Sequence, residues 1–138
     1  MKTIAAVKLE PGNIWSGSRT LAVFTAPTEI AFRKGNLKNH YPVKDYNEKE
    51  YPDAEALYQH MSKDHKANFR HLTEIMTGVL IGKFEQYPIL LETIAISGGV
   101  DFFNKCCHKI NGNKRWEGDG IDSWFIRCLR DAYVLCFI

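Results

Sequence analysis

Apolar residues recur at helical spacing between Phe69 and Lys83. They are Leu72, Ile75, Met76, Val79 and Leu80. On an α-helix such positions form one stripe, because each residue turns the chain by about 100°. The segment therefore predicts a helix with one apolar face, which other elements of the fold have to cover.

Local start and stop signals predict further helices on both sides of this segment. Pro27 suits a first helical turn, and Asp53 and Ser123 suit the capping position, where a side-chain oxygen accepts from a backbone N–H. Gly35 and the pair Gly98-Gly99 are natural terminators. The expected helices are Pro27 to Lys34, Ala54 to about His65, Phe69 to Lys83, Pro88 to Ile96, Val100 to Lys109 and Ser123 to Phe137.

The β content is expected to be small. Residues 3–7 are typical of a short strand, and Val43 to Tyr51 is typical of a hairpin with Asn47-Glu48-Lys49 at its tip. Asn111 to Gly120 is rich in glycine and asparagine and is expected to be a loop. A chain of 138 residues fits one domain. We therefore expect a mainly α (α+β) fold: a single compact helical domain over residues 1–138 with a small β-hairpin.

Composition is that of an ordinary soluble globular protein, with 45% hydrophobic and 25% charged residues. The net charge is +2 and the lysines are mixed with acidic residues, so bulk charge gives no argument for a nucleic-acid or membrane surface. The chain has no apolar run of the ~18 residues that a membrane span needs, and its first residues do not resemble a signal peptide. We expect a cytoplasmic protein without a membrane partner.

The cysteines and histidines give little indication of a metal site. Cys106, Cys107, Cys128 and Cys136 are expected to be free thiols in a reducing compartment. Adjacent cysteines do not easily bind one tetrahedral ion, so Cys106-Cys107-His108 is best explained as buried residues of a helix. A nucleophilic enzyme using Cys106 or Cys107 with His108 is a further alternative, although neighbouring helical residues point apart. No metal or other cofactor is expected.

A first candidate site lies on the helix expected after Asp53. Glu55, Gln59 and Ser62 share one stripe of that helix, with Tyr58 nearby. The ordinary explanation is a solvated face on which Glu55 favours the helix dipole. The preceding segment, Asn39-His40-Tyr41, is expected close to the helix start. A polar stripe facing aromatic groups suits a sugar or nucleobase pocket.

A second candidate site surrounds Asp119. Gly118 and Gly120 flank it, so the backbone can bend sharply and present the carboxylate. Trp116 offers a flat face for stacking, and Arg127 and Arg19 are suited to bind phosphate. Ordinary explanations are again available: Trp124, at the start of the last helix, suits a core position, and Arg127 suits an internal salt bridge.

At these two clusters the chain resembles the NADAR, or YbiA-like, family of N-glycosidases. Leu37-Lys38-Asn39-His40-Tyr41-Pro42 is similar to the family's Leu-Ser-Asn-Phe-Tyr-Pro segment. Residues 51–59, Tyr-Pro-Asp-Ala-Glu-Ala-Leu-Tyr-Gln, are similar to its Tyr-x-(Thr/Ser)-x-Glu-His-Tyr-(Tyr/Phe)-Gln helix. Trp116-Glu117-Gly118 and Arg127 are similar to a C-terminal Trp-x-Gly segment and a following helical arginine. The resemblance covers roughly residues 35 to 130 and implies a YbiA-like fold.

The chain also departs from the family pattern. Ala56 stands where the family has His, and Lys38 and His40 replace Ser and Phe. Ser62 occupies the position of a family lysine that is implicated in holding the opened sugar as a Schiff base, and Lys63 is the nearest lysine. One residue swings a helical side chain by about 100°, so Lys63 has to reach around the helix.

The resemblance implies cleavage of the N-glycosidic bond of a ribosylated base or an ADP-ribosylated nucleobase. It implies Glu55, Asp119 and Lys63 as catalytic residues. The implied substrate-binding residues are Arg19, Asn39, His40, Tyr41, Tyr58, Gln59, Trp116, Gly118 and Arg127. The partner is then a small-molecule nucleotide or ribosylated base, or ADP-ribosylated nucleic acid. The missing His and displaced Lys leave an alternative: a module that binds ADP-ribose or a related nucleotide without cleaving it.

Overall fold

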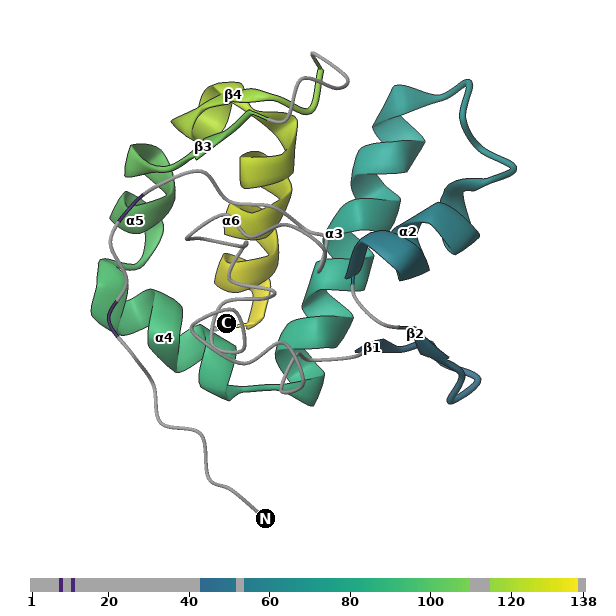
Figure 1. Ribbon diagram of the computed structural model, residues 1–138, viewed down its shortest axis with the longest axis horizontal. Helices are drawn as coiled ribbons and strands as arrows, with labels where there is room; N and C mark the ends of the chain where they lie inside the picture. The colour runs from purple at the N-terminus through teal and green to yellow at the C-terminus, as the bar shows by residue number, and fades with distance from the viewer. Residues whose placement is uncertain (1–7, 9–10, 12–42, 52–53, 110–114, 137–138) are drawn as a thin grey trace.

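A computed structural model describes Lys8, Pro11 and residues 43–51, 54–109 and 115–136. The strand expected over residues 3–7 and the helix expected over 27–34 lie outside the described residues. Five α-helices are described: α2 (Ala54–Ser62), α3 (Phe69–Gln86), α4 (Ile89–Ser97), α5 (Val100–Lys105) and α6 (Trp124–Cys136). The described chain is therefore mainly helical, as the sequence predicts (Figure 1).

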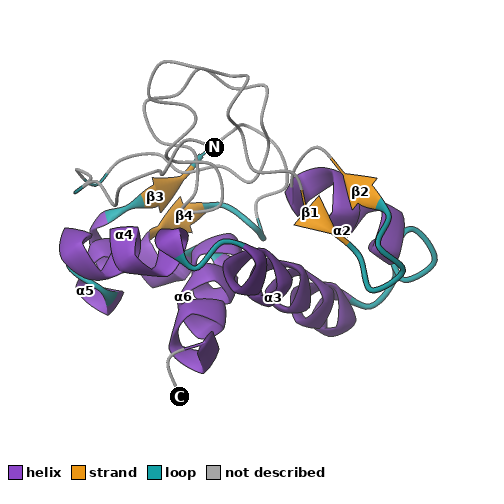
Figure 2. Cartoon of the chain, turned by 90° about the horizontal axis from the view of Figure 1, so that it is seen from below, coloured by secondary structure: helices purple, strands orange, loops and turns teal. Residues whose placement is uncertain are grey.

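Two small antiparallel sheets accompany the described helices. Strand β1 (Val43–Lys44) pairs with β2 (Glu50–Tyr51), and β3 (Cys107–His108) pairs with β4 (Gly118–Asp119). A single turn of 3₁₀ helix, η2 (Gly120–Asp122), leads from β4 to α6. Figure 2 shows β1 and β2 beside α2, at the opposite end of the molecule from β3 and β4.

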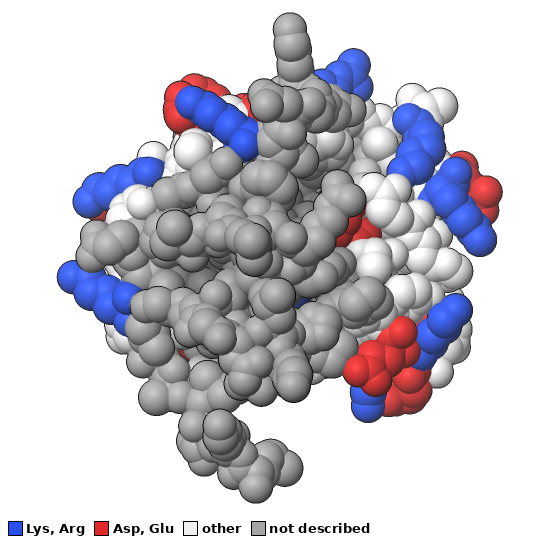
Figure 3. Space-filling view, in the orientation of Figure 1, with Lys and Arg blue, Asp and Glu red and all other residues white. Residues whose placement is uncertain are grey.

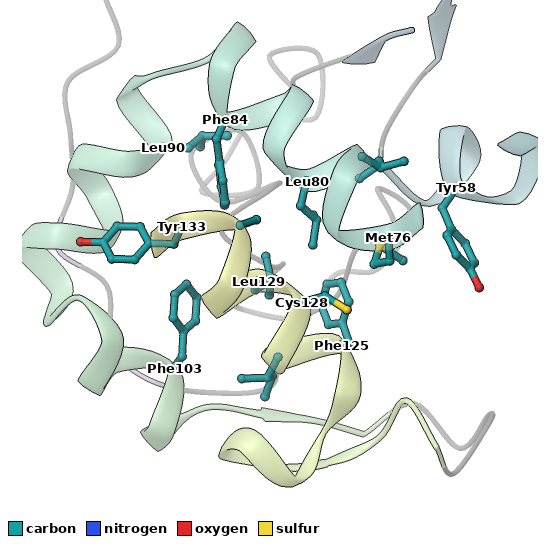
Figure 4. Close-up of a cluster of buried hydrophobic side chains, with 14 of the residues drawn as sticks. Tyr58, Met76, Leu80, Phe84, Leu90, Phe103, Phe125, Cys128, Leu129 and Tyr133 are labelled. Atoms are coloured by element: carbon teal, nitrogen blue, oxygen red, sulfur yellow. The ribbon is translucent and has the colours of Figure 1, made fainter. Parts of the chain in front are cut away.

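The core forms where α3 packs against α6, as the apolar stripe on α3 requires. Leu72, Met76, Val79 and Leu80 of that stripe are buried, and Ile75 is half-buried. Aromatic and aliphatic side chains from α4, α5 and α6 complete the cluster; they include Leu90, Phe103, Phe125, Leu129 and Tyr133 (Figure 4). Burying each such side chain is worth about 1.5–3 kcal/mol, which makes this contact the main stabilising feature of the fold.

The predicted hairpin over 43–51 is confirmed. Asp45 organises its tip: the carboxylate accepts from the backbone N–H of Asn47 at 2.8 Å and of Lys49 at 3.0 Å. Glu48 takes a positive φ of 67°, which the tight turn requires. Val43 then faces Tyr51 across the ladder, and both side chains are buried against the helices.

The prediction that Cys106-Cys107-His108 lies in a helix is wrong. Helix α5 ends at Lys105, and Cys107–His108 forms β3. The loop expected up to Gly120 contains its partner strand, β4. The backbone N–H of Gly120 also donates to the carbonyl of Cys106 at 2.7 Å. These bonds join residues far apart along the chain, so local periodicity does not reveal them.

Apart from α5, which ends four residues before the predicted Lys109, the described helix ends differ from the prediction by three residues or fewer. Helix α2 ends at Ser62 and not near His65, because the chain turns there and the His65 N–H donates to the Ser62 carbonyl at 2.9 Å. Helix α3 continues past Lys83 to Gln86. The predicted cap Ser123 is confirmed, since its Oγ accepts from the Ile126 N–H at 3.2 Å. The predicted cap Asp53 lies outside the described residues.

Within the described part of the chain, no helix is both long enough and apolar enough to span a membrane.

Candidate functional site

Four polar side chains along α2 and in the turn after it form a continuous hydrogen-bonded chain. Gln59 Nε2 donates to Glu55 Oε2 at 2.8 Å. Lys66 Nζ donates to Gln59 Oε1 at 3.0 Å and to Ser62 Oγ at 3.2 Å. We call Glu55, Gln59, Ser62 and Lys66 the α2 network. The predicted stripe on α2 is thus real, and it ends in a lysine that follows the helix.

Lys66, and not Lys63, brings an amine to this stripe. Because α2 ends at Ser62, the chain folds back over the next residues and returns the Lys66 side chain to the helix. Lys63 is exposed, and none of the described contacts joins it to the α2 network. Sequence reasoning missed Lys66 because it extended the helix to about His65. Its position four residues after Ser62 was the one available signal.

Tyr58 links the α2 network to the second candidate cluster. Its side chain is buried, and its ring meets the Trp116 indole edge-on, with 5.7 Å between the centroids. Lys66 Nζ lies 5.5 Å from the centre of the same tyrosine ring. Burial raises the pKa of Tyr58, so its hydroxyl stays protonated at neutral pH. The structure therefore brings Tyr58, Trp116 and the α2 network together.

The position of Trp116 is fixed by the cap of α6. Its carbonyl accepts a hydrogen bond from Ser123 Oγ and another from the Phe125 N–H at 3.4 Å. The indole is half-buried and packs against the core, and its ring centroid lies 5.2 Å from that of Phe69. Phe69 also meets Trp124 at 5.9 Å. We call Tyr58, Trp116, Phe69 and Trp124 the aromatic row.

Asp119 is placed apart from the α2 network. Its carboxylate forms an ion pair with Lys109 at 2.9 Å, and its side chain is 74% exposed. The hydrogen bond to Asp119 raises the pKa of Lys109. None of the described contacts joins Asp119 to Glu55. The flanking glycine at 120 is explained by packing: a Cβ there would lie 2.8 Å from the Asn104 carbonyl oxygen, and its φ is positive.

Arg127 is engaged within its own chain. Its guanidinium lies over the Trp124 ring at 4.6 Å, and its Nε donates to the Ile121 carbonyl. The Trp124 side chain is 39% exposed and is not a core residue. Arg19, Asn39, His40 and Tyr41 lie outside the described residues, so the structure does not place them.

Histidines and cysteines are dispersed over the described residues. His65 and His71 meet with ring centroids 4.5 Å apart, and His108 is buried against Phe125. Among the described residues, no group of three or more His, Cys, Asp or Glu side chains is placed to hold a metal ion. Positive and negative side chains also lie next to one another on the described part of the face in Figure 3.

Comparison with known proteins adds no family assignment. No protein-family model, no curated protein and no solved structure matches the chain.

Proposed function

We propose that the α2 network is the catalytic part of an N-glycosidase that cleaves the bond between ribose and a base, or between ADP-ribose and a nucleobase. The observation that carries this proposal is the unbroken sequence of carboxylate, amide and amine formed by Glu55, Gln59 and Lys66. These groups stand beside a half-buried indole, Trp116, that is linked to them through Tyr58. A sugar ring and an attached base need this pairing of polar and aromatic groups.

Glu55 is the proposed catalytic carboxylate. Breaking the C1′–N bond leaves positive, oxocarbenium-like charge on the sugar, and a carboxylate at the ring stabilises that charge. The bonding electrons leave with the base nitrogen, which takes a proton, and water supplies the hydroxyl at C1′. The hydrogen bond from Gln59, at 2.8 Å, fixes the orientation of the Glu55 carboxylate toward the proposed substrate.

Lys66 replaces Lys63 as the proposed catalytic amine. Its Nζ is hydrogen-bonded to Ser62, at the helix position where the resembled family carries its lysine. The chain thus supplies from the following turn an amine that the helix itself lacks. Lys63, three residues earlier and exposed, is a matched control for the charge and length of this side chain.

The remaining predicted residues enter the proposal as binding groups. Trp116 stacks on the leaving base, and Gln59 hydrogen-bonds a sugar hydroxyl. Arg19 and Arg127 are the proposed phosphate ligands, and Arg127 would release Trp124 or Ile121 to act as one. The remaining proposed substrate-binding residues are Asn39, His40, Tyr41 and Gly118.

A second candidate function is binding of ADP-ribose or a related nucleotide without cleavage. The position of Asp119 favours it, because this carboxylate is neutralised by Lys109 at 2.9 Å and does not contact the α2 network. A site with one carboxylate has fewer groups for general acid–base catalysis than a site with two.

Release of free base, measured by chromatography, tests the proposed function. The parent protein is incubated with aminopyrimidine ribosides and with ADP-ribosylated guanine substrates, beside Glu55→Gln and the control Glu48→Gln on the exposed hairpin tip. We expect base release by the parent and by Glu48→Gln, and its loss in Glu55→Gln. A Glu55→Gln protein with the parent's rate contradicts the assignment. Binding of ADP-ribose without any release favours the second function.

A further inference from the structure

Helices α3 and α6 form a groove on the molecule that is separate from the α2 network. Its volume is about 670 Å³. Residues of α3 make one wall: Thr73, Glu74, Thr77, Gly78 and Ile81. Residues of α6 make the other: Trp124, Cys128, Arg130, Asp131, Val134 and Leu135. None of these residues belongs to the proposed catalytic set.

The two walls differ in shape. The α6 wall carries large apolar side chains that are exposed to solvent: Trp124 at 39%, Val134 at 37% and Leu135 at 55%. Trp124, Cys128, Asp131 and Leu135 follow one another at intervals of three or four residues, so they form one ridge along the helix. The α3 wall carries small residues, Thr73, Thr77 and Gly78, which form a trough beside that ridge.

Gly78 has no explanation within the described chain. It lies in the interior of α3, where glycine is one of the least favourable residues. A Cβ built at this position has no atom within 4 Å, so packing inside the protein does not exclude alanine. A glycine on an open helical surface instead permits another backbone or a large side chain to approach closely.

The charge pattern of the ridge is complementary to itself. Arg130 and Asp131 stand between the apolar ends formed by Trp124 and Leu135. Two α6 helices crossing antiparallel about a twofold axis that passes between Arg130 and Asp131 bring Trp124 of each copy to about 3 Å along the helix axis from Leu135 of the other, because each residue rises ~1.5 Å. Arg130 of each copy is then level with Asp131 of the other, so opposite charges meet on both sides of the twofold axis. Such self-complementarity is what an isologous contact requires.

We propose that this groove is a dimer interface whose occupant is α6 of a second copy of the chain. The α6 ridge of each copy enters the trough beside Gly78 of the other. The two Arg130–Asp131 pairs across the interface fix the register of the helices. The ion pair inside each chain, at 3.0 Å, lies on the surface and is free to be shared across the interface. The exposed Trp124 end of the aromatic row is thereby covered.

Sedimentation equilibrium over a concentration series tests the proposal on the full chain. We expect the parent to dimerise, and Arg130→Asp and Asp131→Arg each to weaken dimerisation by at least about tenfold, since like charges then meet across the interface. The double variant, with the two charges exchanged, restores the parent's dissociation constant. Leu135→Ser and Gly78→Leu weaken the dimer, whereas the control Ile96→Ser, an exposed apolar residue on α4, does not.

A parent that stays monomeric over the whole series overturns the proposal. So does a pair of single charge variants that dimerise like the parent, or an exchanged double variant that remains monomeric. Circular dichroism establishes that each variant is folded. Hydrogen exchange of the parent provides a second readout: protection of α6 has to rise with protein concentration, and protection that is independent of concentration contradicts a dimer through this face. If the chain dimerises through another face, the groove variants dimerise like the parent, and this result also overturns the proposal.

Discussion

Gln59 occupies the middle of the proposed site because a carboxamide is both donor and acceptor. Its Nε2 donates to Glu55 and its Oε1 accepts from Lys66. These two neighbours carry opposite charges and are bridged by one neutral group. In the proposed mechanism, the carboxylate and the amine act on a substrate that binds between them, with Gln59 as the shared hydrogen-bonding group.

The first prediction separates the two lysines. Lys66→Met is expected to lower base release by about 100-fold or more, the usual contribution of a positioned proton donor or nucleophile. Lys63→Met is expected to keep the parent's rate within about twofold, because the described contacts leave Lys63 outside the α2 network. Steady-state kinetics on both purified variants checks this. An inactive Lys63→Met beside an active Lys66→Met would reverse the assignment.

The second prediction concerns Trp116. The sequence predicts a flat face for stacking at Trp116, and the structure shows that the indole is also half-buried and contacts Tyr58 and Phe69. Each aromatic pair is worth about 0.5–1.5 kcal/mol, so Trp116→Ala is expected to lower the free energy of unfolding by about 1–3 kcal/mol. It should also weaken ADP-ribose binding by ~1–3 kcal/mol. Denaturant titration and calorimetry measure the two effects, and unchanged ADP-ribose affinity would remove Trp116 from the site.

The third prediction is a pH dependence at Cys128. Burial raises the pKa of this thiol to about 11, from 9.0. Because the folded-state pKa is the higher one, the neutral thiol's contribution to stability is complete below pH 9 and is lost as the pH rises through 11. The parent should therefore lose up to about 3 kcal/mol more than Cys128→Ala between pH 8.5 and 11.5. Denaturant titrations of both proteins across that range test it; parallel pH profiles would contradict it.

At the scale of elements, the cap of α6 connects the fold to the site. Ser123 Oγ accepts from the Ile126 N–H and donates to the Trp116 carbonyl. One buried hydroxyl thus starts the last helix and fixes the loop that carries the indole. Any change at this position acts on both the helix and the aromatic row.

The fourth prediction follows from this double role. Ser123→Ala is expected to cost about 1–2 kcal/mol of stability, as for other N-caps, and also to weaken ADP-ribose binding. Ser97→Ala is the control: its hydroxyl donates to the Thr93 carbonyl inside α4, far along the chain from the site. Denaturant titration and calorimetry give both quantities. A Ser123→Ala protein with lower stability but unchanged affinity would limit the serine to a structural role.

Elements with local signals could be predicted from the sequence, and those that depend on distant partners could not. The hairpin over 43–51 and the Ser123 cap need only neighbouring residues. Strands β3 and β4 are each two residues long and pair with each other across nine intervening residues, 109–117. The contact of Lys66 with Ser62 could not be predicted without knowing where α2 ends, because a shift of less than one turn decides which lysine reaches Ser62. The hydrogen bond between Glu55 and Gln59 could be predicted from the sequence, because residues four apart are neighbours on a helix.

At the scale of the whole molecule, the α3–α6 core separates two surfaces. Helix α2 lies beside α3 on the side away from α6 (Figure 1), and the groove lies between α3 and α6. The aromatic row runs from Tyr58 to Trp124 and so reaches from one surface to the other. The proposed catalytic residues and the proposed dimer interface thus lie on different elements, and Trp124 belongs to both the aromatic row and the groove.

A crystal structure of the parent protein soaked with ADP-ribose tests the location of the site most directly. We predict density for a ribose within hydrogen-bonding distance of Glu55 and Gln59, with Lys66 Nζ beside it and Trp116 against an attached ring. Density at the α3–α6 groove alone, or a ligand bound with the α2 network untouched, would contradict the account.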